Sequence, residues 1–224
     1  MLKYSANPDK YGSHERILAM LQDLPAGSSV LDVGSAGGYF GERLAGRGYY
    51  VVGVEQDEAA ASVAASFYDE FIVADVESGL RLSRKFDVIV LADILEHLRQ
   101  PLNVLFHLRD LLSSTGRFVI SVPNVANIYV RLNLLLGRFD YAERGILDET
   151  HLRFFTLNSA CALVQKAALR VKQIVVTPIP LPLLFPGTRE GGSWHFLHRA
   201  NWAITQTWKR LFAYQMIIVA VPAP

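Results

Sequence analysis

The feature that most constrains this chain is a glycine-rich stretch at residues 30–38, which reads VLDVGSAGG. Val30 to Val33 are apolar, as in a buried strand, and the turn after them admits only small residues. From Tyr39 onward, apolar residues recur at helical spacing. A strand, a tight glycine turn and a helix N-terminus form a ligand cradle, because free backbone N–H groups point outward there. Dinucleotides and S-adenosylmethionine are the two ligand classes that such a cradle holds.

Two residues of this stretch favour S-adenosylmethionine over a dinucleotide. Asp32 stands just ahead of the first glycine, where its carboxylate would repel a pyrophosphate. The same carboxylate suits a ligand that carries an ammonium and a sulfonium. Ala36 occupies the position at which the dinucleotide pattern G-x-G-x-x-G has its second glycine. We therefore expect S-adenosylmethionine to be the ligand.

Three further apolar segments, at residues 49–54, 71–73 and 86–91, are predicted to be strands. Each is followed by small or acidic residues, which are Glu55, the pair Asp75-Val76 and the pair Ala92-Asp93. Because helical segments alternate with these strands, the sheet should be parallel, with its carboxyl ends meeting at one edge. There Glu55 is placed to accept hydrogen bonds from both ribose hydroxyls, and Asp75-Val76 to bracket an adenine.

Three motifs resemble those of class I S-adenosylmethionine-dependent methyltransferases. They are LADILEHL at 91–98, SVPN at 121–124 and HLRFFT at 151–156. They are most similar to a branch with ubiquinone-pathway O-methyltransferases, small-RNA 2′-O-methyltransferases and bacterial sugar and natural-product enzymes. The resemblance implies an α/β fold with a seven-stranded Rossmann-like sheet of order 3-2-1-4-5-7-6. Helices would cover both faces of that sheet, and the last strand would run antiparallel.

The glycine loop and the strand tips together give the predicted cofactor site. Its residues are Asp32, Gly34, Ser35, Gly38, Glu55, Gln56, Asp75, Val76 and Ala92.

The chemistry of methyl transfer points to a second group of residues. A hydroxyl acceptor has a high pKa, so it needs a general base or a metal ion that stabilises the alkoxide. If a helical turn follows the fourth strand, Asp93, Glu96 and His97 lie on one face. Two carboxylates and an imidazole form half of a shell for Mg²⁺, Mn²⁺ or Zn²⁺. We expect Asp93 and His97 to be catalytic in either case.

The resemblance adds His151 as a fourth metal ligand. Related O-methyltransferases hold a divalent metal with an acid-x-x-Glu-His motif, and the small-RNA enzymes complete the site with a later histidine. Asp93, Glu96, His97 and His151 match that pattern, although Asp93 replaces the usual glutamate. Two alternatives stay open. In the first, Glu96 and His97 are structural and His97 is at most a base. In the second, His151 and Arg153 either anchor their loop or bind the acceptor.

Size and composition fit a single domain spanning residues 1–224, with residues 1–24 forming an N-terminal arm and helix. A formal net charge of +1 gives no electrostatic case for binding nucleic acid. The single cysteine, Cys161, fits a reducing compartment. The first residues lack the apolar run of a signal peptide, and no stretch is long enough to span a membrane. We expect a cytoplasmic protein.

Residues 178–213 form an insertion before the last strand. A proline-rich apolar run at 178–186 has too many prolines for a helix or an inner strand. A helix at about 193–212 follows, and this insertion holds all three tryptophans of the chain. Three roles are open for it: a lid over the acceptor pocket, a homodimer face, or a peripheral contact with a membrane surface.

The predicted activity is methyl transfer to a hydroxyl of a small molecule, such as a sugar or a glycosylated or lipid-linked metabolite. Methylation at nitrogen or carbon in the same site is an alternative. A non-catalytic S-adenosylmethionine-binding partner subunit is another, and it would keep Gly34 and Glu55 without needing Asp93 or His97. An RNA acceptor is disfavoured, because no basic surface or RNA-binding module is evident.

Overall fold

A computed structural model describes residues 9–22 and 24–224, which form a seven-stranded sheet of order β3-β2-β1-β4-β5-β7-β6. The strands are β1 Ser29–Val33, β2 Tyr50–Glu55, β3 Glu70–Val73, β4 Phe86–Ala92, β5 Leu112–Pro123, β6 Leu169–Thr177 and β7 Gln215–Pro222. β1 to β5 pair in parallel, whereas β7 runs antiparallel to both β5 and β6. The predicted strand order and the predicted antiparallel last strand are therefore confirmed.

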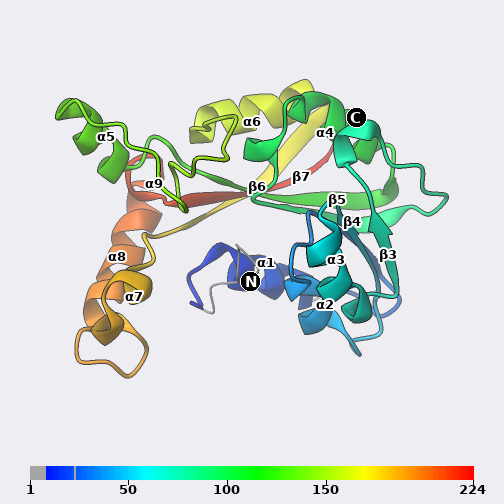
Figure 1. Ribbon diagram of the computed structural model, residues 1–224, viewed down its shortest axis with the longest axis horizontal. Helices are drawn as coiled ribbons and strands as arrows, with labels where there is room; N and C mark the ends of the chain where they lie inside the picture. The colour runs from blue at the N-terminus through cyan, green and yellow to red at the C-terminus, as the bar shows by residue number, and fades with distance from the viewer. Residues whose placement is uncertain (1–8, 23) are drawn as a thin grey trace.

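Helices cover both faces of the sheet, as Figure 1 shows. The first face is covered by α1 Ser13–Gln22, α2 Tyr39–Leu44 and α3 Glu58–Ala64. On the other face lie α4 Pro101–Arg109 and α6 Leu157–Lys166, while α5 Ile128–Leu135 lies beyond one end of the sheet. The side chains of β1 alternate between the two faces: Val30 packs with α1 and α2, while Leu31 and Val33 pack with α4 and α6. Side chains at successive strand positions point to opposite faces, so both layers of core are built from the same strands.

The fifth strand begins earlier than the sequence predicts. In the sequence, Thr115-Gly116 indicates a turn and residues 118–122 indicate a strand, but β5 already starts at Leu112. The pairing register between β4 and β5 shifts between Phe86 and Val88, so β5 continues through this irregular pairing as one strand of the sheet. A Cβ at Gly116 would lie 2.7 Å from the Phe86 carbonyl oxygen, which explains a glycine inside a strand.

The insertion also differs in detail from the expectation. The proline-rich run contains a short helix, α7 Leu181–Leu184, because Pro182 lies in the first turn, where a missing N–H costs nothing. The single helix expected at 193–212 is two helices, α8 His195–Thr207 and α9 Lys209–Phe212, which meet at Trp208. α7 and α8 lie together at one end of the molecule, beyond the sheet (Figure 1).

The N-terminal prediction is only partly covered by the structure. α1 begins at Ser13 and ends before Pro25, so the helix predicted within residues 1–24 is present, but most of the predicted arm, residues 1–8, lies outside the described residues.

Candidate functional site

The glycine loop between β1 and α2 has three residues with left-handed backbone. Gly34 has φ +74° and Gly38 has φ +82°. Ala36 between them has φ +44°, which residues with a Cβ rarely adopt. Gly34 N–H donates to the Val54 carbonyl oxygen at 2.8 Å. A Cβ on Gly34 would come within 2.1 Å of the Ile94 Cδ1, so glycine is needed here for conformation and for space.

Glu55 ties this loop to the tip of the second strand. Its Oε2 accepts a hydrogen bond from Ala36 N–H at 2.8 Å. Its Oε1 accepts from the N–H groups of Gln56 at 2.8 Å and Asp57 at 3.0 Å. A carboxylate that accepts three backbone N–H groups is held in one orientation, and it fixes the strained backbone at Ala36.

Asp32 lies inside the sheet beneath the loop. It is 1% exposed, and its Oδ2 accepts a 2.6 Å hydrogen bond from the Tyr68 hydroxyl. Burial raises the pKa of Asp32 to about 7; the Tyr68 bond opposes that rise and the Glu55 charge adds a little to it. Asp32 therefore changes its charge near neutral pH, where an ammonium or sulfonium close by would favour the ionised form.

A cavity of about 550 Å³ lies at the carboxyl edge of the sheet, where the parallel strands end. Six of the predicted site residues line it: Gly34, Glu55, Gln56, Asp75, Val76 and His97. Predicted residues that do not line it are Asp32, Ser35, Gly38, Ala92, Asp93, Glu96 and His151. The cavity thus joins part of the predicted cofactor set to His97.

The sequence does not predict the part of the cavity wall that Glu77, the start of α4 and Leu152 form. Glu77, Gln100, Asn103, His107 and Leu152 line it. Glu77 accepts hydrogen bonds from the backbone N–H groups of Gln100 at 2.7 Å and Arg99 at 3.2 Å, which anchors the start of α4 there. The sequence predicts that a helix begins at Pro101, but no signal in it pairs position 77 with position 100.

Asp93 is placed differently from the prediction. Its φ is +55°, and the 3₁₀ turn that follows β4 starts only at Leu95, so Asp93 and Glu96 do not share one helical face. Its carboxylate instead accepts hydrogen bonds from Ser121 Oγ at 2.7 Å and Gln215 Nε2 at 2.6 Å. Asp93 therefore ties β4 to β5 and β7, and the expectation of a common helical turn was wrong.

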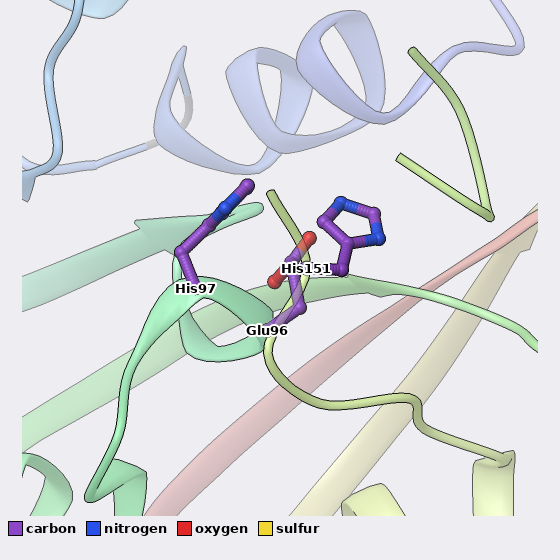
Figure 2. Close-up of side chains that lie close together, drawn as sticks. All are labelled: Glu96, His97 and His151. Atoms are coloured by element: carbon purple, nitrogen blue, oxygen red, sulfur yellow. The ribbon is translucent and has the colours of Figure 1, made fainter. Parts of the chain in front are cut away.

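Glu96, His97 and His151 come together at the end of β4 (Figure 2). One ligand atom from each residue, a carboxylate oxygen or an imidazole nitrogen, lies within 4.8 Å of the other two. The ring centroids of His97 and His151 are 4.9 Å apart. Of the four predicted metal ligands, the structure brings these three into a cluster that does not include Asp93.

Both histidines use Nδ1 to contact a backbone carbonyl. His97 Nδ1 lies 3.2 Å from the Thr150 oxygen, and His151 Nδ1 lies 3.1 Å from the Ile146 oxygen. A carbonyl can only accept, so in the neutral form of each ring this contact favours the tautomer with the proton on Nδ1 and the lone pair on Nε2. Burial, and then the neighbouring His97, lower the pKa of His151, which favours the neutral ring. Backbone carbonyls orient metal-ligating histidines in this way.

Glu96 is the unusual member of the cluster. Its side chain is 1% exposed, and neither carboxylate oxygen accepts a hydrogen bond from the described residues. Burial first, and then the charges of Asp93 and Asp148, raise the pKa of Glu96 well above its ordinary value. The backbone N–H of Glu96 itself lowers the pKa slightly, although it forms no hydrogen bond with the carboxylate. A buried carboxylate with no donor is costly unless a proton or a cation neutralises it.

The segment that carries His151 is anchored to the Glu96 turn. The N–H groups of Leu152 and Arg153 donate to the Glu96 carbonyl oxygen at 2.9 and 3.0 Å. The Arg153 guanidinium contacts the carbonyl oxygens of Leu98 and Arg99. Arg153 thus acts as the loop anchor that was one of the two expectations for it, and the loop reaches the cluster through backbone contacts.

The chain is similar to a known protein family over most of its length. A family model described as "Methyltransferase domain" matches residues 9–174, which include the glycine loop and the Glu96 cluster. The chain belongs to this methyltransferase family. Together with the relatives below, this makes the chain an S-adenosylmethionine-dependent methyltransferase. The match ends before residue 178, so the insertion lies outside it.

Individual relatives support the same family. A ubiquinone biosynthesis O-methyltransferase from Paraburkholderia phytofirmans is 30% identical over 166 residues, covering 69% of this chain and 71% of the relative. A mitochondrial ubiquinone biosynthesis O-methyltransferase from Schizosaccharomyces pombe is 33% identical over 105 residues, covering 43% of this chain but only 38% of its own length.

The fold is shared more widely than the sequence. The structure of magnesium protoporphyrin IX methyltransferase from Synechocystis PCC 6803 with bound SAH superimposes with a TM-score of 0.62. It is 16% identical, and the match covers 98% of this chain and 90% of that one. The likeness at this level of identity concerns the fold.

None of the helices within residues 9–22 and 24–224 combines the length and the apolar character needed to cross a membrane.

Proposed function

We propose that the protein transfers a methyl group from S-adenosylmethionine to a hydroxyl oxygen of a small molecule. One observation carries this proposal: His97 lines the same 550 Å³ cavity as Gly34, Glu55 and Asp75. The residue expected to activate the acceptor thus faces the space expected to hold the methyl donor. The relatives named O-methyltransferase support the choice of oxygen.

In this proposal the cofactor lies along the strand tips. Gly34, Ser35 and Gly38 shape the loop beside it, and Ala92 lies at the tip of β4. Glu55 and Gln56 face the ribose, while Asp75 and Val76 bracket the adenine. Asp32 supplies negative charge beneath the sulfonium and ammonium. Five of these residues line the cavity, which supports their placement.

We also propose that Glu96, His97 and His151 hold a divalent metal ion such as Mg²⁺ or Mn²⁺. The residues fit such an ion, because the buried Glu96 carboxylate accepts no hydrogen bond within the described part of the chain and both histidines direct Nδ1 to a carbonyl. A bound ion would lower the pKa of an acceptor hydroxyl and orient it. Two imidazoles and one carboxylate suit Mn²⁺ or Zn²⁺ better than Mg²⁺, which prefers oxygen ligands.

The chain's own residues have the remaining tasks. Hydrogen bonds from Ser121 and Gln215 hold Asp93 in place. Asp93 in turn positions the turn after β4 that carries Glu96 and His97. The methyl transfer itself is an in-line displacement, so the protein must hold donor and acceptor in line and exclude water. In the alternative without a metal, His97 accepts the hydroxyl proton at Nε2.

Methyl transfer to a metabolite extract tests the function. The extract comes from a host that lacks this protein, and the donor is S-adenosylmethionine with a deuterated methyl group. Mass spectrometry should find a labelled product, and NMR should place the methyl group on oxygen. A label on nitrogen or carbon would refute the proposed acceptor atom. No labelled product, with cofactor binding intact, would favour a non-catalytic partner subunit.

Chelation distinguishes the two modes of hydroxyl activation. If a metal acts, a chelator should abolish turnover, and Mg²⁺ or Mn²⁺ should restore it. The His151→Ala variant sharpens the test, because a further ligand matters to a metal site but not to a lone base. Full activity in that variant, together with indifference to chelator, would leave His97 as the base.

A further inference from the structure

Helix α8, His195–Thr207, buries polar side chains and exposes apolar ones. His198 and Thr205 are 2% and 0% exposed, and they lie seven residues apart on one face. On the outer face Phe196 is 62% exposed, and Leu197 and Ile204 are also exposed. A helix on the surface of a water-soluble protein has the opposite arrangement. The outer face of α8 is therefore suited to a non-aqueous environment.

Hydrogen bonds on the inner face hold α8 in this orientation. His198 Nε2 lies 2.8 Å from Asp9 Oδ2, in a contact whose two side chains are both buried. Asn201 Nδ2 donates to the Ile179 carbonyl oxygen at 2.8 Å, and Thr205 Oγ1 donates to the Asn201 carbonyl oxygen at the same distance. Rolling the helix to hide its apolar face would break these bonds. The exposure is thus built into the fold.

The apolar surface extends beyond α8. It comprises the exposed residues Leu183, Leu184, Phe185, Trp194, Phe196, Leu197, Ile204 and Trp208, here called the insertion patch. α7 and α8, which carry most of these residues, lie together at the end of the molecule (Figure 1). A concentration of exposed apolar side chains in one segment is typical of a surface that contacts another molecule or a membrane.

The charges of the insertion indicate what kind of surface the patch contacts. Residues 178–213 contain the basic side chains Arg189, Arg199, Lys209 and Arg210, but only one acidic side chain, Glu190. Glu190 already pairs with Lys10 at 2.8 Å. Two copies of this surface related by a two-fold axis would bring basic residues together, which opposes a homodimer. An anionic surface complements them.

We propose that the insertion patch docks on an anionic lipid bilayer, with α8 lying in the plane of the headgroups. The helix is 13 residues long, which suits a helix that lies on a membrane rather than one that crosses it. Its outer face supplies the apolar side chains that enter the acyl boundary, and Arg199, Lys209 and Arg210 meet the anionic headgroups. The inference does not rest on the acceptor or on the metal.

Tryptophan fluorescence reports directly on this surface, because all three tryptophans of the chain, Trp194, Trp202 and Trp208, lie in the insertion. The full chain is titrated with vesicles of phosphatidylcholine and phosphatidylglycerol in equal parts, and with vesicles of phosphatidylcholine alone. The anionic vesicles should shift the emission to the blue and co-sediment with the protein. The neutral vesicles should bind much more weakly. No shift and no co-sedimentation with the anionic vesicles would refute the proposal.

Two sets of variants separate the apolar and charged contributions. Phe196→Gln with Ile204→Gln should lower vesicle partitioning at least tenfold, and Val63→Gln, an exposed apolar residue on α3, should leave it unchanged. Arg199→Gln with Lys209→Gln and Arg210→Gln should lower it roughly a hundredfold, whereas the exposed Arg81→Gln should not. Unchanged circular dichroism and cofactor affinity would confirm that the variants fold. If the emission shifts with protein concentration alone, and light scattering finds a dimer, the patch is a homodimer face instead.

Discussion

Glu55 is the last residue of β2 and Glu96 follows the end of β4, so both lie at the same edge of the sheet, but their surroundings differ. Glu55 is partly exposed and accepts three backbone N–H groups from its own and the neighbouring loop. Glu96 is buried, and its oxygens accept no hydrogen bond from the described residues. The Glu55 carboxylate is therefore satisfied by hydrogen bonds within the protein, while the Glu96 carboxylate has none from the described residues. A chain that keeps such a costly group needs it for something other than folding.

The largest expected effect falls in the Glu96 region. His97→Ala should lower kcat by roughly 10²–10⁴-fold, because either version of the mechanism loses the group that activates the hydroxyl. Affinity for the demethylated cofactor should stay within about twofold of the parent protein. Steady-state kinetics on the identified acceptor and calorimetry check the two statements. A variant that loses cofactor affinity while keeping kcat would show that His97 belongs to the other region.

Asp32 tests the cofactor region through its pH dependence. The folded protein keeps the Asp32 proton up to about pH 7, whereas the unfolded chain releases it near pH 4. Raising the pH from 4 to 7 therefore favours the unfolded chain, by up to roughly 4 kcal/mol. Asp32→Asn removes this penalty, so its free energy of unfolding should exceed that of the parent at pH 8.

Urea denaturation at pH 5 and pH 8, without cofactor, measures the difference. The advantage of Asp32→Asn should shrink toward acid pH, while the exposed control Asp140→Asn should show no such trend. The same Asp32 variant should bind S-adenosylmethionine more weakly, since its charge is lost. A pH-independent difference would contradict the raised pKa.

Glu55→Ala is expected to have a smaller effect, on affinity alone. Losing the hydrogen bonds that the ribose hydroxyls would donate to this charged acceptor should weaken cofactor binding by roughly 1.5–3 kcal/mol. Glu55→Gln keeps an acceptor oxygen for the Ala36 N–H and should lose less. The exposed Glu58→Ala serves as the control. Calorimetry that finds unchanged affinity in Glu55→Ala, or binding of NAD to the parent protein, would overturn the assignment of the cofactor site.

Ala36→Gly should have the smallest effect. The left-handed φ of +44° costs a residue with a Cβ about 1 kcal/mol, and glycine removes that strain. The greater freedom of glycine in the unfolded chain offsets about 0.4–1 kcal/mol of the gain. Denaturation should therefore show a stabilisation of less than about 1 kcal/mol. Clear destabilisation would mean that the Ala36 methyl group contributes packing that the backbone conformation does not reveal.

The sequence predicts the parts of the molecule that depend on local pattern. The glycine loop, the strand tips and the family motifs predict the sheet order and the position of Glu55 beside the loop. Gly34 and Gly38 mark the turn between Val33 and Tyr39 in the sequence, because glycine adopts the positive φ found there without steric cost.

Features that depend on contacts distant in sequence could not be predicted in this way. Gln215 donates a hydrogen bond to Asp93 although the two residues are 122 positions apart in the sequence. The left-handed backbone at Asp93 therefore could not be predicted from the residues next to it. The inner and outer faces of α8 were equally hidden, because its polar face is satisfied by Asp9 and Ile179, far from it in sequence. Pattern alone would have placed His198 and Thr205 in solvent.

Titration with Mn²⁺ tests the central claim, that the Glu96 region is built to receive a cation. Calorimetry on the full chain needs no acceptor and no turnover. The account predicts one Mn²⁺ per chain, with binding weakened at least tenfold in both Glu96→Gln and His151→Ala and unchanged in Glu55→Gln. Absence of Mn²⁺ binding in the parent protein, or equal binding in the parent and Glu96→Gln, would contradict it.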